Sequence, residues 1–236
     1  MKILNYKLYY FLGIGGIGMS ALARYFNHYK RKAAGYDKTS TFLTSQLESE
    51  GIKCHFEENL SLLKELLSSY KKEEVLIIYT PAVPQTHQEY QFLSENGYKI
   101  LKRSQVLGEI TKQFKTIAIA GTHGKTTTTT LVTHILKSAG VNCFSFMGGI
   151  SKNYNTNLLL GEINSEDTYI VVEADEYDRS FLTLHPLIAV ITSVDADHLD
   201  IYGNADQVKE GYSLFAKQVK EDGILIVKKN VDNEIK

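Results

Sequence analysis

The sequence has few cysteines, no long apolar run and almost no net charge, and each shortage excludes a class of protein. Only two of its 236 residues are cysteines, Cys54 and Cys143, which lie far apart without a CxxC spacing. A disulfide framework or a structural zinc site is therefore not expected, and we predict two reduced, buried thiols. The formal net charge of −1 gives no indication of broad binding to nucleic acid or to a membrane surface.

Insertion into a membrane is not expected either. No stretch approaches the roughly 20 apolar residues that a membrane-spanning helix needs. Residues 8–14 (LYYFLGI) resemble the apolar part of a signal peptide, but they lead into a glycine loop and not into a small-residue cleavage site. We therefore predict a buried strand there and a cytoplasmic protein. The content of 43% hydrophobic and 22% charged residues is that of an ordinary globular protein.

Short apolar runs alternate with amphipathic segments of helical length. The runs predicted as strands are Leu8–Leu12, Lys32–Tyr36, Val75–Tyr79, Thr116–Ala120, Val141–Phe146, Tyr169–Val172, Leu187–Ser193 and Ile224–Val227. The segments predicted as helices are Ile17–His28, Leu60–Ser69, Gln88–Glu95, Gln105–Thr111, Thr126–Ala139 and Gln207–Val219. Apolar strands separated by helices are typical of parallel sheets covered on both faces.

A strand that ends in a glycine loop and leads into a helix occurs twice, beginning at Leu8 and again at Thr116. The two starts predict an α/β protein with two doubly wound parallel-sheet domains, joined near Arg103–Lys115. We expect a Rossmann-like N-terminal domain over residues 1–107 and a second domain, with a phosphate-binding loop, over residues 108–236.

The first glycine loop, residues 13–18, fits the pattern GxGxxG through Gly13, Gly15 and Gly18. Asp37 follows the next predicted strand, about 20 residues further on, as in dinucleotide-binding folds. The glycines let the backbone approach a diphosphate, and the helix N-terminus supplies N–H donors. NAD, another diphosphate such as a UDP-sugar, and a merely tight turn all remain open. Asp37 is either a ribose contact or a solvated turn residue.

The second glycine loop reads Gly121-Thr122-His123-Gly124-Lys125-Thr126-Thr127 and follows an apolar strand. It departs from the full Walker pattern because Ile119 stands where the first glycine of GxxxxGK[ST] belongs. The remaining parts do the same work: backbone N–H groups cradle phosphate, Lys125 lies against the β- and γ-phosphates, and the Thr126 hydroxyl ligates Mg²⁺. A chance match to GKT is the alternative.

An acidic cluster follows the predicted strand that ends near Val172. Glu173 comes directly after this apolar run, where ligands collect at the carboxyl ends of parallel strands. We therefore predict that Glu173 holds Mg²⁺ directly or through water. Glu176 and Asp178, slightly further on, fit a solvated acidic turn better.

A second polar cluster, residues 193–200, follows the predicted strand Leu187–Ser193. A lone histidine is usually structural, but His198 stands beside Asp195 and Asp197 after a second sheet strand. His198 is therefore a candidate metal ligand or a group that steers a phosphoryl group. For the two aspartates we expect no more than a role in orienting His198.

These segments together resemble the Mur ligase family. The sequence FLGIGGIGMSALA at Phe11–Ala23 resembles the family's UDP-binding loop, and AGTHGKTTTT at Ala120–Thr129 resembles its ATP loop. EADEYDRSF at Glu173–Phe181 and DADHLDIYG at Asp195–Gly203 resemble its two metal-binding segments. Four motifs in the family's order cover most of the chain. They are most similar to the branch of the family that adds L-alanine to UDP-N-acetylmuramate.

The resemblance implies a reaction and a set of site residues. ATP phosphorylates the carboxylate of UDP-N-acetylmuramate, the amine of L-alanine attacks the acyl phosphate, and phosphate leaves. Lys125 and His198 would be catalytic, and His123 would touch the substrate or only fill the loop. The implied Mg²⁺ ligands are Thr126, Glu173 and His198. The implied UDP-binding residues are Gly15, Gly16, Ile17, Gly18 and Asp37.

The resemblance also implies a fragment, because members of the family are longer and have a further C-terminal domain. We expect the ATPase domain of this chain to be truncated and the chain by itself to be inactive. Two other functions remain open: a nucleotide-dependent dehydrogenase built on the first loop, and a noncatalytic module that binds UDP-sugars. Oligomeric state is not predicted.

The first prediction concerns the ligand of the N-terminal domain. Because its glycine loop stands beside a predicted phosphoryl-transfer site that needs a carboxylate substrate, we expect residues 1–107 to bind UDP-N-acetylmuramate in calorimetry. Tight binding of NADH without binding of the UDP-sugar would overturn this expectation.

Overall fold

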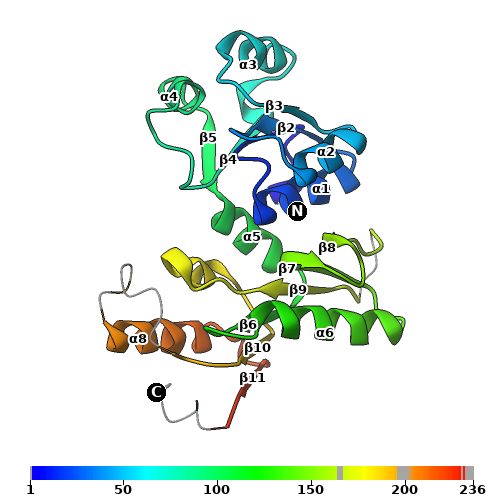
Figure 1. The fold of residues 1–236 in the computed structure, drawn as a ribbon, viewed down its shortest axis with the longest axis vertical. Helices are drawn as coiled ribbons and strands as arrows, with labels where there is room; N and C mark the ends of the chain where they lie inside the picture. Colours follow the sequence, from blue (N-terminus) through cyan, green and yellow to red (C-terminus); the bar gives the residue numbers. More distant parts are fainter. Residues whose placement is uncertain (1, 164–166, 196–201, 203, 230, 232–236) are drawn as a thin grey trace. The chain divides into compact units, whose positions relative to one another are not determined.

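The chain consists of two compact units, Met1–Val106 and Leu107–Lys236. The structure is a computed structural model that describes residues 2–163, 167–195, 202, 204–229 and 231 (Figure 1). The division between the units falls within helix α5 (Arg103–Thr111), one residue from the boundary that the sequence predicts.

The first unit is a five-stranded parallel sheet with the order β3-β2-β1-β4-β5. Its strands are β1 (Leu8–Leu12), β2 (Lys32–Tyr36), β3 (Lys53–His55), β4 (Val75–Tyr79) and β5 (Lys99–Lys102). Its helices are α1 (Ile17–His28), α2 (Phe42–Ser49), α3 (Leu60–Leu67) and α4 (Gln88–Glu95), with short 3-10 turns at Lys2–Leu4 and Lys72–Glu74.

Helices cover both faces of this sheet. Alternate residues of β1 point to opposite sides, and all five are buried. On one side Tyr10 packs in a cluster with Leu63 of α3 and Leu93 of α4. On the other side the Tyr9 ring stacks on Phe26 of α1, with ring centroids 3.8 Å apart. This is the doubly wound arrangement that uninterrupted apolar strands require.

The second unit is a six-stranded sheet with the order β11-β10-β6-β9-β7-β8, in which only the β7–β8 pair is antiparallel. Its strands are β6 (Lys115–Ala120), β7 (Cys143–Ser151), β8 (Thr156–Leu159), β9 (Tyr169–Glu173), β10 (Ile188–Ile191) and β11 (Ile224–Val227). Its helices are α6 (Lys125–Ser138), the 3-10 segment η3 (Tyr177–Thr183) and α8 (Ala205–Ala216).

The core of the second unit lies between its sheet and α6. Val132 and Leu136 of α6 pack against Ile117 and Val171, which lie on the neighbouring strands β6 and β9. Helix α8 packs on η3, where Phe181 stacks on an aromatic ring of α8. Strand β11 is an edge strand, and its first three residues are 40–55% exposed.

All strands and helices that the apolar runs predict are present, with ends shifted by a few residues. Three short strands, β3, β5 and β8, were not predicted, and all three lie at sheet edges. These three edge strands are short and carry polar residues, so they lack the uninterrupted apolar run that made the edge strand β11 predictable. Helix α2 was also missed because its residues, FLTSQLES, are half polar.

The two thiols are free, as predicted, but only one of them is buried. Cys143 is fully covered, whereas Cys54 lies half-buried in the edge strand β3. The prediction of two buried thiols is therefore wrong for Cys54. Its surroundings still raise the pKa of the Cys54 thiol to about 12, mainly through loss of hydration, so the thiol stays protonated at neutral pH.

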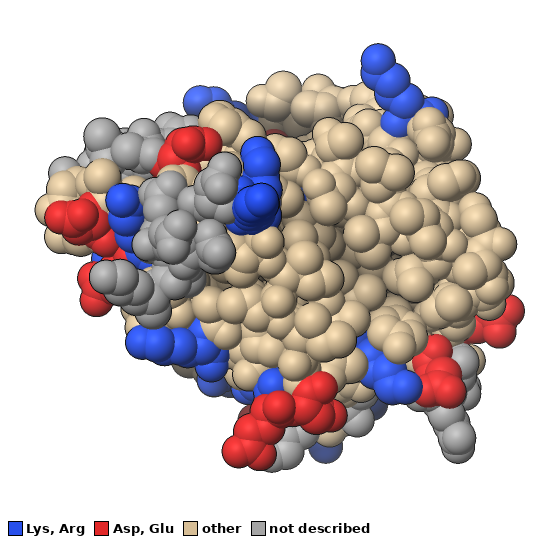
Figure 2. Space-filling model, turned by 90° about the horizontal axis from the view of Figure 1, so that it is seen from below, with Lys and Arg blue, Asp and Glu red and all other residues tan. Residues whose placement is uncertain are grey.

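The described residues include no helix that is long and apolar enough to cross a membrane. On the face that Figure 2 shows, Lys and Arg side chains alternate with Asp and Glu around a broad area of other residues. The basic residues on this face do not gather into one patch.

A buried carboxylate connects three elements of the first unit. The side chain of Glu89 on α4 is fully buried. It accepts hydrogen bonds from the Tyr10 hydroxyl at 2.5 Å and the Asn59 N–H at 2.9 Å, and it lies 2.8 Å from Nε2 of His55. Burial alone would raise the pKa of Glu89, but the bonds to His55, Asn59 and Tyr10 together hold it below its ordinary value.

This network gives a prediction for stability against pH. Since the folded-state pKa of Glu89 is lowered, the ionised carboxylate stabilises the fold above the unfolded-state pKa, near 4.5, and this contribution is lost as the pH falls through the folded-state value. Glu89→Gln should lower the free energy of unfolding by roughly 1–3 kcal/mol at pH 7 and by much less near pH 3.

Urea unfolding of both proteins at the two pH values measures the difference. Glu95→Gln, an exposed position on the same helix, is the matched control and should change stability by less than about 0.5 kcal/mol. An equal loss for Glu89→Gln at both pH values would show that the charge of Glu89 is irrelevant.

Candidate functional site

The loop between β6 and α6 is built around two glycines with positive φ. Gly121 has φ +136° and Gly124, the residue that caps α6, has φ +82°. A Cβ atom on Gly121 would come within 2.1 Å of the Thr192 hydroxyl, so both backbone and space require glycine there. The loop delivers the chain directly into the N-terminus of α6, whose free N–H groups and dipole favour an anion.

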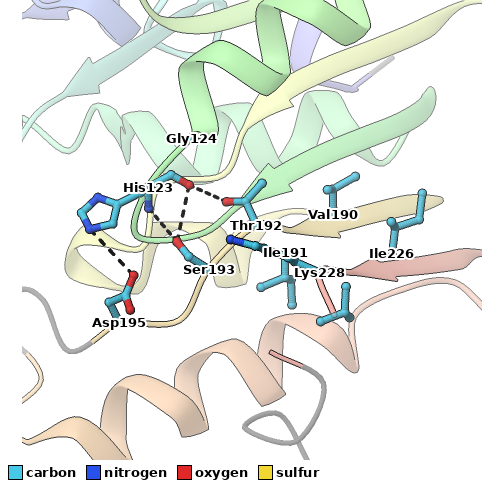
Figure 3. Close-up of a pocket in the computed structure, with 10 residues that line it drawn as sticks. His123, Gly124, Val190, Ile191, Thr192, Ser193, Asp195, Ile226 and Lys228 are labelled. Carbon is cyan, nitrogen blue, oxygen red and sulfur yellow. Dashed lines mark hydrogen bonds and ion pairs between the residues drawn. The ribbon is translucent and has the colours of Figure 1, made fainter. Parts of the chain in front are cut away.

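The segment after β10 braces this loop. The His123 N–H donates to the Ser193 hydroxyl at 2.8 Å, and the Thr192 hydroxyl donates to the His123 carbonyl at 2.5 Å (Figure 3). The Thr122 hydroxyl exchanges hydrogen bonds with the backbone of Asp195, at 2.9 and 3.1 Å. The segment after β10 therefore fixes the conformation of the loop. Nothing in the sequence predicted these hydrogen bonds.

Lys125, the first residue of α6, is held by two acceptors. Its Nζ donates to the Gly121 carbonyl at 2.8 Å and to Oε1 of Glu176 at 2.7 Å. Glu176 was predicted to lie in a solvated turn, and this prediction is wrong, because its side chain is only 4% exposed. Burial raises the pKa of Glu176, and the hydrogen bond from Lys125 opposes that shift.

Glu173 and Thr126 meet at the carboxyl end of the sheet. Parallel pairing sets Glu173, the last residue of β9, opposite Ile119 of β6, just before the glycine loop. The Thr126 hydroxyl donates to Oε1 of Glu173 at 3.0 Å, and the Gly148 N–H donates to Oε2 at 2.9 Å. Sequence reasoning did not single out Gly148, which lies in the unusually long strand β7.

The oxygen atoms of Thr126 and Glu173 suit Mg²⁺, a hard cation that usually takes one or two protein ligands and completes its shell with water and phosphate. Among the described residues there is no group of three or more His, Cys, Asp or Glu side chains that could hold a metal ion. Any ion here would therefore depend on phosphate oxygens as well as on the protein.

His198, predicted as a catalytic residue and metal ligand, lies outside the described residues, as does Asp197. Asp195 is described, and its Oδ2 lies 3.8 Å from Nε2 of His123. Both of these side chains are well exposed, so this pair is a loose one. The predicted meeting of His198 with Glu173 and Thr126 stays a prediction.

A hollow of about 540 Å³ adjoins the glycine loop. His123 and Gly124 line one end, and apolar side chains from the ends of β10 and β11, among them Val190, Ile191 and Ile226, line another (Figure 3). Figure 3 shows these residues arranged side by side along the strand ends. The hollow can take a flat, partly apolar group attached to a phosphate chain that lies on the loop.

The glycine loop of the first unit is fixed by a carboxylate. The N–H groups of Gly13 and Ile14 both donate to the Tyr36 carbonyl, at 2.8 and 2.9 Å. The Gly15 N–H donates to Oδ2 of Asp37 at 2.7 Å, so Asp37 shapes the loop. Its predicted contact with a ribose stays a prediction. The loop ends at Gly16, which caps α1, and Ile17 and Gly18 form the first turn of that helix.

Arg103 is a residue of this region that sequence reasoning missed. A Cβ atom on Gly18 would come within 2.9 Å of its Nη1, so the guanidinium lies against the first turn of α1. Arg103 follows β5, a strand that the apolar runs did not predict, so no sequence pattern indicated that it lies here. A guanidinium beside a helix N-terminus is well suited to a phosphate group.

These features define an α/β protein with one diphosphate-type loop and one nucleotide-type loop on separate sheets. The family description "Mur ligase family, catalytic domain" matches residues 8–115, and "Mur ligase middle domain" matches residues 119–236. The chain belongs to the Mur ligase family.

The similar proteins fit this assignment. UDP-N-acetylmuramate–L-alanine ligase of Cytophaga hutchinsonii is 49% identical over 100% of this chain and 50% of its own length. The protein of the same name from Flavobacterium johnsoniae is 51% identical over 95% of this chain and 49% of its own length. The chain spans about half the length of the curated relatives it matches.

Solved structures agree with this fold. UDP-N-acetylmuramate-alanine ligase of Thermotoga maritima is 26% identical, with a TM-score of 0.79 over 94% of this chain and 49% of that one. A Neisseria ligase named for UDP-N-acetylmuramate and a tripeptide is 23% identical, with a TM-score of 0.85 over 97% of this chain and 74% of that one, which supports the fold alone.

The geometry around Glu173 gives a second prediction. A Cβ atom on Gly148 would lie 2.4–2.6 Å from the atoms of the Glu173 carboxyl group, so Gly148→Ala must displace that carboxylate and break its bond to Thr126. Gly149→Ala is the matched control, because its Cβ would meet only Thr126 Cγ2 at an ordinary 3.6 Å. Crystal structures of both variants measure the Thr126–Glu173 distance. A bond retained in Gly148→Ala would contradict the prediction.

Proposed function

We propose that this chain carries the UDP-sugar-binding and ATP-binding parts of a ligase that joins L-alanine to the carboxylate of UDP-N-acetylmuramate. The convergence of Lys125, Thr126 and Glu173 at one end of one sheet is the observation that supports a phosphoryl-transfer enzyme. The specific reaction is supported by the names of relatives that are about half identical to it over the matched residues.

The proposed reaction has two steps. A carboxylate oxygen of UDP-N-acetylmuramate attacks the γ-phosphorus of ATP, and the bond to the β–γ bridging oxygen breaks to release ADP. The amine of L-alanine then attacks the acyl carbon, phosphate leaves, and the amine loses a proton. The ammonium group of Lys125 would stabilise the charge that develops on the transferred phosphoryl group.

ATP would lie along the loop of residues 121–127. The N-terminus of α6, which Gly124 caps, suits its phosphates, and the hollow lined by residues of β10 and β11 suits its nucleoside part. Thr126 and Glu173 would hold Mg²⁺, with His198 as a further predicted ligand. Bound there, the ion would offset phosphate charge and orient the phosphates for transfer.

The UDP part of the other substrate would lie on the first unit. Gly15, Gly16, Ile17 and Gly18 would line the UDP site at the start of α1, and Asp37 keeps the loop in shape by accepting the Gly15 N–H. The guanidinium of Arg103 adds a positive charge that fits a diphosphate. A cytoplasmic location follows from this proposal, since the reaction consumes ATP.

Two other functions compete with this one. A dehydrogenase would use only the first loop, and it would not explain the presence of the phosphate loop, Lys125 and Glu173. A noncatalytic UDP-sugar module would have no use for them either. The nucleotide loop braced by the segment after β10 therefore favours the ligase.

The test is a phosphate-release assay on the protein expressed from its complete coding sequence. Release that requires ATP, Mg²⁺, UDP-N-acetylmuramate and L-alanine together supports the proposal. Release that another amino acid or a peptide stimulates better than L-alanine would replace the proposed substrate, and NADH oxidation without release of phosphate would replace the reaction.

Lys125→Ala gives a third prediction. The variant should fold, because the side chain is held at the site and not in the apolar core, but turnover should fall by about 10²-fold or more (roughly 3 kcal/mol), as when a transition-state donor is removed. Lys137→Ala, exposed near the end of the same helix, is the control and should keep its activity. Turnover of Lys125→Ala at the wild-type rate would remove Lys125 from the mechanism.

A further inference from the structure

Glu176 is a buried carboxylate that contacts the lysine of the phosphate loop. Its Oε1 lies 2.7 Å from Lys125 Nζ, with 4% of its own side chain and 16% of the lysine side chain exposed. The ammonium also donates to the Gly121 carbonyl at 2.8 Å, and the Thr122 carbonyl lies further away at 3.5 Å. Two acceptors on different elements thus fix the direction of a side chain that has four rotatable carbons.

The backbone that carries Glu176 is itself held in an unusual shape. Its carbonyl accepts a 2.7 Å hydrogen bond from the buried hydroxyl of Tyr202. Two residues later the chain turns through Asp178 and Arg179, which have φ values of 51° and 52° although neither is glycine. Consecutive non-glycine residues in the left-handed region are strained, and such strain persists only where the surrounding structure enforces it. Glu176, which lies two residues before this turn, is buried with its carboxylate against Lys125 of the phosphate loop.

A buried ion pair of this kind is a weak device for stability. Removing two charges from water costs about as much as their attraction returns, so an apolar pair would serve the fold equally well. What the pair does provide is a fixed position for the ammonium group. Stabilisation of a transition state depends on charges that are already in place when the reaction begins.

We propose that Glu176 is a positioning residue, which together with the Gly121 carbonyl fixes the Lys125 ammonium so that its third N–H group meets the phosphoryl group in transfer. This inference rests on the proposed function, because it assumes that Lys125 acts on ATP. Glu176 itself touches neither the nucleotide nor the reacting carboxylate.

The experiment compares Glu176→Gln with the wild-type protein, expressed from the complete coding sequence. Glutamine has the same shape and can still accept a hydrogen bond, but it lacks the charge that orders Lys125. We expect kcat to fall about tenfold or more with the KM for ATP changed less than about threefold, since only a transition-state interaction is weakened. Asp178→Asn is the matched control, because Asp178 is exposed and asparagine tolerates its left-handed backbone. It should behave as wild type.

Two further measurements separate positioning from a purely structural role. AMP, which lacks the phosphates that Lys125 would meet, should bind Glu176→Gln as it binds the wild type. In a double-mutant cycle, adding Glu176→Gln to Lys125→Met should cost nothing further, because Glu176 acts through the lysine. If Glu176→Gln melts below the assay temperature, Glu176→Asp, which keeps the charge on a shorter stem, takes its place in the same cycle.

The outcomes distinguish this inference from the proposed function. An active wild type whose Glu176→Gln variant keeps its kcat, or whose double variant is slowed by the product of the two single effects, overturns the positioning role and leaves the ligase proposal standing. A wild-type protein that neither binds ATP nor releases phosphate overturns both.

Discussion

The site in the second unit depends on parallel pairing of β6 with its two neighbours. The pairing fixes Glu173 beside Ile119 on one side and Ile191 beside Ala120 on the other, so all three strands end at the same edge. Lys125 and Thr126 enter from β6, Glu173 and Glu176 from β9, and the bracing residues Thr192 to Asp195 from β10. A change of register by one residue in β9 would turn Glu173 to the opposite face of the sheet.

The two glycine loops each lead from a strand into the N-terminus of a helix, but they differ in backbone conformation and in the charges around them. In the first, the Asp37 carboxylate accepts the Gly15 N–H and Arg103 lies beside the first turn of α1. In the second, Lys125 belongs to the helix itself and is held against a buried acid. A lysine inside the loop region suits chemistry on a terminal phosphate, whereas an arginine beside it suits holding a diphosphate that does not react. This difference fits the proposed function, in which the first loop binds a diphosphate and the second takes part in phosphoryl transfer.

Among the described residues, each unit has a buried carboxylate with a defined set of partners. Glu89 is satisfied by a tyrosine, a histidine and a backbone N–H, and these bonds outweigh the effect of burial on its pKa. Glu176 has Lys125 as its charged partner, and burial prevails in its pKa. The difference in pKa matches the surroundings of the two residues. Glu89 joins three elements of a core, whereas Glu176 lies beside the loop of residues 121–127, which we propose binds phosphate. A charge held this way fixes its partners more firmly than a charge in water.

The sequence by itself determined the class of fold, the two units, the family and most of the nucleotide loop, because these features are local. An apolar run, a glycine at a turn and the lysine after it follow one another along the chain, and parallel sheets need little else. Only the tertiary structure decided which residues contact and position these local features. Glu176 follows Glu173 in an acidic run that looks like a solvated turn, and only the tertiary structure shows that its side chain is buried against Lys125. Gly148, Arg103 and the bracing residues are distant in sequence from the atoms they meet, and no local pattern records a contact made across a sheet.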